Sequence, residues 1–226
     1  AKGVWIPDAA QLTDAAANAL LKTLEEPPAQ TWFFLASTEP ARLLATLRSR
    51  CRLHHLAPPP ESYAISWLAR EVTASSEALL SALRLSAGSP GAALTLLQAE
   101  SWAHRTDFCA ALVNTLNAGD WYILLAALNH DQAAARLHWL ATLLTDALKR
   151  PYGIAHLTNP DALDLISSIA ERLSVAQIQA ILGDVCHCRQ QLLNVTGVNR
   201  ELVLTDLILR IEHYLQPGTV LPVPHL

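Results

Sequence analysis

The sequence predicts a mainly α-helical protein that begins with a small α/β segment. Hydrophobic residues make up 51% of the 226 residues, aromatic residues only 6%, and there are 8 glycines. Leu and Ala are abundant, and because both lose little conformational freedom on entering a helix, they favour helices over strands. The runs that suggest strands lie in the first 56 residues, and helical spacing of apolar residues dominates the rest.

The first 58 residues alternate between strand and helix patterns. Gly3–Ile6 is expected to be a short buried strand, Trp32–Ala36 a second strand, and Arg52–Leu56 is a candidate third. Strands that alternate with helices in this way indicate a parallel sheet covered on both faces. Three strands are few for an α/β domain, so we expect the chain to begin partway through one.

Two helices are expected among these strands. Thr13 is a typical N-cap for the first, which a pair of prolines ends. The second is expected over Ala41–Arg48, with Thr38 as its cap and Pro40 at its start. The apolar face of the first helix shows the spacing i, i+3, i+4, i+7 at Ala17, Leu20, Leu21 and Leu24.

The remainder of the chain carries helical patterns. Three consecutive prolines, Pro58–Pro60, form a stiff linker, so a boundary is placed after residue 58. Residues 59–100 predict a small bundle of three short helices: Glu61–Val72, Ser76–Ala87 closed by Gly88, and Pro90–Gln98 opened by Ser89. Residues 101–226 predict five or six longer helices, with breaks near 117–119, 129–131, 151–160 and 196–199 and an extended tail from residue 216.

Charge and composition exclude several classes of protein. The net charge of −4 argues against a protein that coats nucleic acid by bulk charge. The longest apolar run, Trp121–Leu128, is far shorter than the roughly 20 residues needed to cross a bilayer. No secretory signal is visible, and the 4 cysteines are too few and too scattered for a disulfide framework. We therefore expect a cytoplasmic protein without a membrane partner.

A cluster of cations near residue 50 has two interpretations. Arg48, Arg50 and Arg52 fall between an expected helix and an expected strand, close to Arg42, His54 and His55. Cations at the end of a helix are favoured by the helix dipole and need no further role. Arginine in such a turn can alternatively present its planar, permanently charged group to phosphate.

Three blocks of sequence resemble the clamp-loader branch of the AAA+ ATPases in order and spacing. These are NALLKTLEEPP at 18–28, FLASTEP at 34–40 and SRC at 49–51. Residues 179–187 and 199–202 resemble one particular subunit of the bacterial DNA polymerase III clamp loader. The resemblance implies part of a RecA-like AAA+ domain over 1–58, a helical lid over 59–100, and a helical collar over 101–226 that holds a ring of subunits together.

The resemblance also implies a nucleotide site that has lost key residues. ATP-hydrolysing relatives carry an Asp-Glu pair that orders magnesium and the attacking water. That pair falls here on Pro7 and Asp8, or on Asp8 and Ala9 if a gap is allowed, and a lid arginine is replaced by Gly91. The phosphate-binding loop is absent from these residues. A subunit without ATPase activity or a cofactor of its own is implied, with ATP and magnesium in its neighbours and zinc in an N-terminal part outside this sequence.

Arg50 nevertheless lies in an intact Ser49-Arg50-Cys51. In the family this arginine acts in trans as a finger, stabilising charge on the γ-phosphate held by the neighbouring subunit. Ser37 and Thr38 match the family's first sensor position, although Thr38 has the simpler role of a helix cap. The implied partners are the ATPase subunits, the clamp-opening delta subunit, the sliding clamp and primed DNA.

Other candidates and functions are weaker. Cys186 and Cys188 flank His187, but residues two apart on a helix point to different faces and cannot share one metal ion without another segment. Trp102, Trp121 and Trp139 are expected in the core or a subunit interface, because bases stack on aromatics interleaved with cations. Two rival functions stay open: an active AAA+ ATPase whose phosphate-binding loop lies upstream, and a purely structural helical adaptor.

Overall fold

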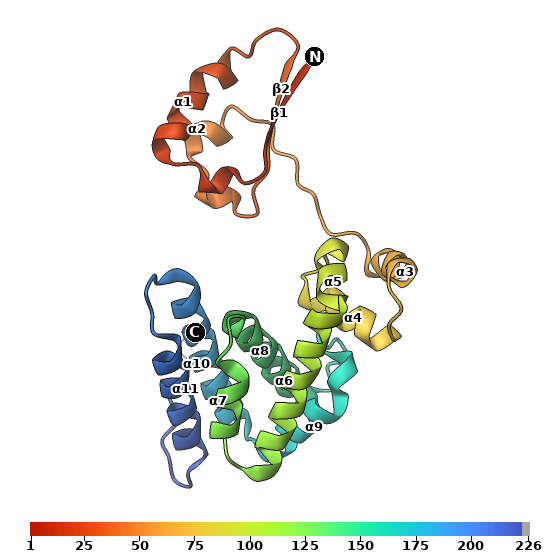
Figure 1. The fold of residues 1–226 in the computed structure, drawn as a ribbon, viewed down its shortest axis with the longest axis vertical. Coiled ribbons are helices and arrows are strands. Elements are labelled where there is room, and N and C mark those ends of the chain that lie inside the picture. The colour runs from red at the N-terminus through yellow and green to blue at the C-terminus, as the bar shows by residue number, and fades with distance from the viewer. Residues whose placement is uncertain (223–226) are drawn as a thin grey trace. The chain divides into compact units, whose positions relative to one another are not determined.

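The computed structural model describes residues 1–222 and divides the chain into two compact units, Ala1–Ala57 and the part from Pro58 onward (Figure 1). The mainly α fold expected from the sequence is confirmed, because eleven α-helices and two strands account for the regular structure of these residues, apart from short 3-10 turns.

The first unit is built on a parallel β-α-β arrangement. The two strands pair in parallel with Val4 opposite Phe33. The helix between them starts at Thr13, whose hydroxyl accepts the Ala16 N–H at 3.2 Å. This confirms Thr13 as the cap and the parallel direction of the strands. The elements in order are β1 (Lys2–Ile6), η1 (Ala9–Gln11), α1 (Asp14–Glu25), β2 (Thr31–Leu35), η2 (Pro40–Arg42) and α2 (Ala45–Arg48).

Three expectations for this unit are wrong. β1 is a strand but is not buried, because the described sheet has two strands and one of its faces leaves Trp5 64% and Trp32 66% exposed. Residues 52–56 form no strand, since no described strand pairs with them. The single helix expected over 41–48 is split, because Leu43 and Leu44 adopt extended backbone angles between η2 and α2.

Three short helices form a small bundle at the start of the second unit: α3 (Glu61–Glu71), α4 (Ser76–Leu85) and α5 (Pro90–Leu97). Ser75 and Ser89 cap α4 and α5, each accepting a backbone N–H three residues ahead. Gly88, with φ +81°, closes α4, and its N–H donates to the Leu83 carbonyl at 2.9 Å. The bundle has its own core, which includes Leu68, Leu79 and Leu83.

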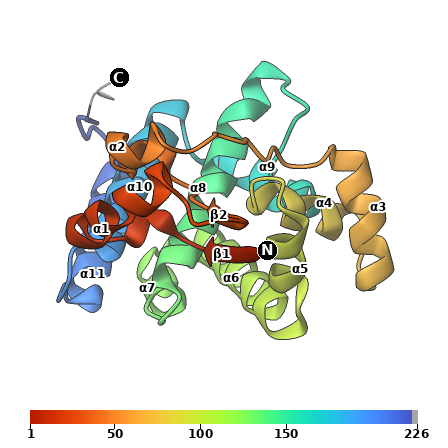
Figure 2. The ribbon, with the colours of Figure 1, turned by 90° about the horizontal axis from the view of Figure 1, so that it is seen from above.

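Six further helices pack around a second, larger core. Leu140, Leu143, Ile181 and Ile208 are among its completely buried residues. In Figures 1 and 2 the α3–α5 bundle and α11 lie at opposite ends of the second unit. The six helices are α6 (Ala99–Ala118), α7 (Tyr122–Leu128), α8 (Ala133–Lys149), α9 (Leu163–Arg172), α10 (Val175–Asn194) and α11 (Arg200–Leu215), with 3-10 turns η3 (Arg150–Tyr152) and η4 (Pro160–Ala162).

One break, between α9 and α10, was not among those predicted from the sequence. Leu173 is extended there, and Ser174 starts α10 with a capping box in which its side chain and that of Gln177 each bond the other's backbone N–H. The break bends the chain by 115° between the two helices. Six helices lie between residues 99 and 215, within the expected five or six, but α7, with 7 residues, is shorter than the helices of the preceding bundle.

Residues 216–222 lie outside regular secondary structure, and the last four residues of the expected extended tail, 223–226, lie outside the described residues. Within residues 1–222, no single helix has both the length and the hydropathy needed to cross a bilayer. The segment Pro160–Arg172 and α10 have that length and hydropathy when they are taken together, but the chain is bent between them.

Candidate functional site

Arg50 lies in the turn that follows α2. Ser49 is the C-cap of this helix, and the Arg50 N–H donates to the Leu47 carbonyl at 3.1 Å. The turn therefore continues the last helical hydrogen bonds and fixes the backbone of Arg50. No strand follows it, so the expectation that the arginines lie between a helix and a strand is corrected to a helix and an irregular segment.

The Arg50 guanidinium is held by three groups of its own chain. Its Nε donates to Glu25 Oε1 at 2.6 Å, and Nη2 donates to the same oxygen. Its Nη1 donates to the Thr46 carbonyl at 2.9 Å and to Ser49 Oγ at 3.4 Å. The Arg50 side chain remains 30% exposed and that of Glu25 49%. Arg50 is thus an oriented, partly exposed cation rather than a freely moving one.

The two residues that flank Arg50 have structural roles. Ser49 Oγ donates to the Thr46 carbonyl at 3.0 Å, which places its oxygen beside Arg50. Cys51 is half-buried, and burial raises the pKa of its thiol. The thiol is therefore neutral at physiological pH and adds no charge beside the arginine.

The carboxyl ends of β1 and β2 meet at one edge of the sheet. The Ala9 N–H donates to the Ala36 carbonyl at 2.8 Å, so residues 7–9 lie next to the start of the segment that carries Ser37 and Thr38. Parallel strands bring their carboxyl ends together in this way, and ligands of α/β sheets bind at such edges. The structure therefore gathers these five predicted residues at one place.

That edge of the sheet offers few side-chain groups that could bind a metal ion or polarise water. The Asp8 carboxylate caps η1, accepting the Ala10 N–H at 3.1 Å and the Gln11 side chain at 2.9 Å. Ala9 is 2% exposed, and neither Pro7 nor Ala9 has a side chain that could bind a metal or polarise water. One carboxylate is left at the edge, and it is already engaged.

The expectation that Thr38 caps the next helix is wrong. The residue at the N-cap of η2 is Glu39, and it makes no side-chain capping bond. Ser37 instead accepts the Glu39 N–H at 3.0 Å, so the polar side chain that orders this turn is Ser37. The cause is the η2 turn, which begins at Pro40 and leaves the N–H groups that Thr38 was expected to bond outside its reach.

The remaining predicted positions belong to the second unit. Gly91 is the second residue of α5 in the second unit, where an added Cβ would meet nothing within 4 Å. His187 lies on α10 between an exposed and a buried cysteine, and burial raises the pKa of Cys188 to about 11. Across residues 1–222, no group of three or more His, Cys, Asp or Glu side chains is placed to hold a metal ion.

The other cations of the cluster differ from Arg50. Arg42 pairs with Glu39 at 3.2 Å, a surface ion pair one helical turn apart. Arg48, Arg52 and the two histidines that follow are exposed. Arg50 differs from Arg42 in that three groups of the chain, rather than one, bond its guanidinium. Of the three tryptophans, Trp121 and Trp139 are in the core, at 2% and 5% exposure.

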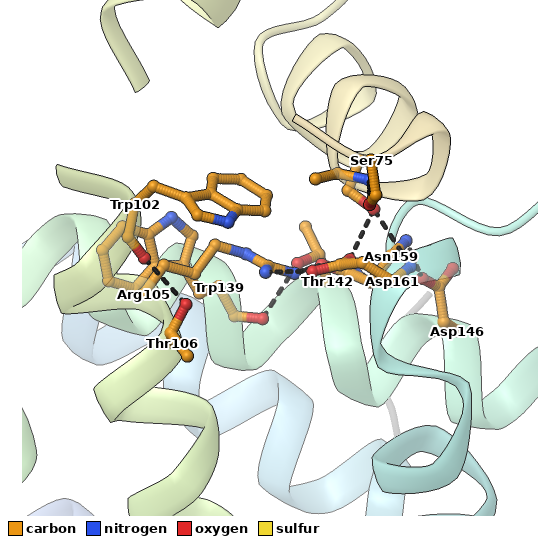
Figure 3. A network of polar contacts seen from close by, with 11 residues as sticks. Ser75, Trp102, Arg105, Thr106, Trp139, Thr142, Asp146, Asn159 and Asp161 are labelled. Atoms are coloured by element: carbon orange, nitrogen blue, oxygen red, sulfur yellow. Dashed lines mark hydrogen bonds and ion pairs between the residues drawn. The ribbon is translucent and has the colours of Figure 1, made fainter. Parts of the chain in front are cut away.

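Sequence reasoning missed a buried polar network in the second unit, shown in Figure 3. Arg105 of α6 is 2% exposed, lies under the Trp102 ring at 4.7 Å, and points toward Asn159 and Asp161. Its Nη2 donates to Asn159 Oδ1 at 2.9 Å and to Asp161 Oδ1 at 3.1 Å. Ser81 of α4 donates its hydroxyl to Asp161, which links the α3–α5 bundle to the later helices.

Asp146 of α8 binds the segment before α9 that carries Asn159 and Asp161. Its carboxylate is completely buried and accepts the backbone N–H groups of Thr158 and Asn159, at 3.0 and 2.8 Å. The Lys149 ammonium, 2.8 Å away, balances its charge. Apart from the Lys149–Asp146 pair, the bonds to Asn159, Asp161 and their neighbour Thr158 join residues 12 to 80 apart along the chain, so no local pattern could have indicated the network.

Comparison with known proteins gives a consistent result along the chain. Residues 1–60 match a family model described as DNA polymerase III, delta subunit. Residues 59–98 match the AAA+ ATPase lid domain of DNA polymerase III subunit delta', and residues 99–213 match the C-terminal model of DNA polymerase III, delta subunit. The fold and these matches define a subunit of a DNA polymerase III assembly with an AAA+ lid.

The similar proteins identify the family. DNA polymerase III subunit delta' of Escherichia coli is 71% identical over all 226 residues, which cover 68% of that protein. The subunit delta' of Yersinia pestis is 47% identical over the whole chain, again with 68% of that protein covered. DNA polymerase III subunit tau of Salmonella typhimurium is 62% identical over 39 residues, 17% of this chain and 6% of that protein. The chain belongs to the DNA polymerase III subunit delta' family.

Proposed function

We propose that this chain serves in the clamp loader of the DNA polymerase III holoenzyme as a subunit that does not hydrolyse ATP. It presents Arg50 to ATP bound by a neighbouring subunit and so helps to load the sliding clamp on primed DNA. The observation that carries the proposal is a contrast within the first unit. Arg50 is oriented and partly exposed, whereas Asp8, the one carboxylate of the expected metal pair, is engaged in a cap.

The chemistry of arginine suits this role. The guanidinium is planar, permanently charged and able to donate two parallel hydrogen bonds to phosphate oxygens. A finger of this kind contributes about 10³ to 10⁵ in rate in well-studied phosphoryl-transfer systems. In this proposal Arg50 is the finger, and Ser49 and Cys51 are the uncharged residues of the turn that carries it.

The absence of ATPase activity is proposed from the residues at the sheet edge and in α5. Neither Pro7 nor Ala9 can replace the missing carboxylate, and Gly91 offers no side chain to a nucleotide. ATP and magnesium would therefore act in the neighbouring subunits. Ser37 and Thr38 are assigned no role in catalysis.

The proposal divides the chain into three parts, residues 1–58, 59–100 and 101–226. It assigns assembly to the helices of the last part. On α11, Leu202 and Leu209 are seven residues apart and are 66% and 50% exposed. Exposed leucines at this spacing form a stripe that suits a partner helix. The partners we propose are the ATPase subunits and the delta subunit, with the clamp and primed DNA reached through the complex.

The proposal is tested by ATP hydrolysis with and without the other subunits. The purified full-length subunit alone should turn over no ATP, and adding it to the ATPase subunits should raise their DNA-stimulated hydrolysis. Replacing Leu202 and Leu209 by Asp should weaken assembly while leaving the subunit folded, and Tyr63→Asp on α3, at a residue 64% exposed and outside residues 101–226, is the control. Steady ATPase activity of the subunit alone, sensitive to mutation, would contradict the proposal.

One observation favours the structural adaptor as a second candidate. Arg50 already has an anionic partner within its own chain, Glu25, as an ordinary surface arginine often does. The adaptor function requires that the loss of Arg50 leave ATP hydrolysis by the complex unchanged. The finger and the adaptor therefore differ in a single measurable outcome.

A further inference from the structure

The hydrogen bonds of Arg50 leave it little capacity to bind phosphate in its present arrangement. A guanidinium has five N–H donors. Four hydrogen bonds are already made, two to Glu25, one to Thr46 and one to Ser49. A single N–H cannot form the two parallel bonds with which arginine grips phosphate. Arg50 must therefore release a partner before it can act as a finger.

Glu25 is the partner that phosphate would replace. It occupies the edge formed by Nε and Nη2, which is one of the two-pronged edges of the guanidinium. The pair is partly exposed, with side-chain exposures of 30% and 49%. Exposed ion pairs of this kind contribute little to stability, equivalent to about a 1.4- to fivefold change in an equilibrium constant. The pair can therefore open at little cost.

The position of Glu25 in α1 is unusual for a carboxylate. It is the last residue of the helix, at the negative end of the helix dipole, where an anion is unfavourable. Arg50 follows the end of another helix and brings a positive charge to this point. The two helix ends thus meet through this ion pair, and the carboxylate is compensated by the proposed finger.

We propose that Glu25 holds Arg50 in a closed position, from which the γ-phosphate of a nucleotide in a neighbouring subunit displaces it. The inference rests on the proposed role of Arg50 as a trans-acting finger. A terminal phosphate has three oxygens and more negative charge than one carboxylate. It can therefore replace Glu25 as the partner of Arg50, whereas a weaker anion cannot. Glu25 is a positioning residue that acts through Arg50 and does not touch the nucleotide.

The test is Glu25→Gln in the full-length subunit, reconstituted into the complex. Glutamine keeps the size and one acceptor oxygen but removes the charge. Because a smaller fraction of Arg50 is then closed, the apparent affinity of the neighbouring site for the slowly hydrolysed analogue ATPγS should rise by about two- to fivefold. ATP hydrolysis in the absence of DNA should rise by a similar factor. Both effects should vanish when Glu25→Gln is combined with Arg50→Ala.

Two variants serve as controls. Glu26→Gln removes the adjacent carboxylate, which makes no ion pair among the described residues. Glu39→Gln removes the partner of Arg42 in a comparable surface pair at 3.2 Å. Both should leave ATPγS affinity and hydrolysis as in the unmodified complex.

The outcomes separate this inference from the proposed function. If Arg50→Ala abolishes stimulated hydrolysis and Glu25→Gln changes neither readout, the role of Arg50 as a finger is supported, and the proposal that Glu25 holds it in a closed position is refuted. A Glu25→Gln complex as impaired as Arg50→Ala would also refute it, since Glu25 would then be a fixed support of the active finger. If Arg50→Ala itself leaves hydrolysis unchanged, the proposed function fails and the inference fails with it.

Discussion

Arg105 and Asp161, 56 residues apart in the chain, form a buried ion pair in which both terminal nitrogens of the arginine donate to the carboxylate, at 2.5 and 3.1 Å. The pair joins α6 to the loop before α9, and Ser81 ties the same loop to α4. The α3–α5 bundle and the later helices are therefore connected by polar contacts as well as by the chain.

Arg105→Ala should lower the free energy of unfolding by about 3–5 kcal/mol, because it leaves the Asp161 carboxylate without its cation in a largely buried site. Urea unfolding, followed by circular dichroism, measures the change. Arg70→Ala, at an exposed position of α3, is the control and should stay within about 0.5 kcal/mol of the unmodified protein. A loss for Arg105→Ala no larger than the control would show that the pair does not stabilise the fold.

The stability of the second unit should depend on the protonation of His138 in α8. Burial, reinforced by Arg189, lowers the pKa of His138 in the folded protein. Above its unfolded pKa of about 6.5 the imidazole is neutral in both states, and below that value the unfolded chain binds a proton that the folded protein resists. The free energy of unfolding should therefore fall as the pH drops below about 6.5, and His138→Gln should fall less steeply. Parallel slopes for the two proteins would contradict this.

The two cysteines of α10 should differ in reactivity toward iodoacetamide. Cys186 is exposed, whereas Cys188 is 4% exposed, and burial raises its pKa to about 11. Because the thiolate is the reactive form, Cys188 should remain unmodified at about pH 8 until the protein unfolds. Mass spectrometry of timed samples measures this. Equal rates of alkylation in the folded protein would show that Cys188 is more accessible than the structure describes.

The helices of the second unit could be predicted because their signals are local. Ser75 and Ser89 cap their helices as expected, and Gly88 closes α4 with a positive φ angle. Apolar residues at helical spacing indicated the helices from α6 to α11, except for the division between α9 and α10. The break at Leu173 was missed, because its signal is the Ser174 and Gln177 capping box within an otherwise continuous pattern.

The errors in the first unit have the opposite cause. Whether a short segment such as 52–56 forms a strand depends on a hydrogen-bonding partner elsewhere in the chain, and no described strand offers one. Thr38 does not cap the next turn because that turn, η2, begins at Pro40 and has Glu39 at its N-cap.

The candidate site was predicted in part. The intact motif Ser49-Arg50-Cys51 indicated Arg50 as a candidate residue. Its partner Glu25 was not predicted, because it lies 25 residues earlier in the chain. A carboxylate at the unfavourable end of a helix was the signal that could have indicated it. The network around Arg105 could not be predicted, since its groups meet only when four separate segments have folded.

The central claim is that Arg50 acts on ATP bound by a neighbouring subunit, and the most direct measurement is DNA-stimulated ATP hydrolysis by complexes that differ only at this position. Arg50→Ala should assemble normally and lose most of the stimulated rate, and Arg50→Lys should restore little, because an ammonium lacks the two-pronged geometry of the guanidinium. Arg42→Ala, in the exposed pair with Glu39, should keep the full rate. Equal rates for the unmodified and Arg50→Ala complexes, with assembly confirmed, would contradict the claim and leave the structural adaptor as the function.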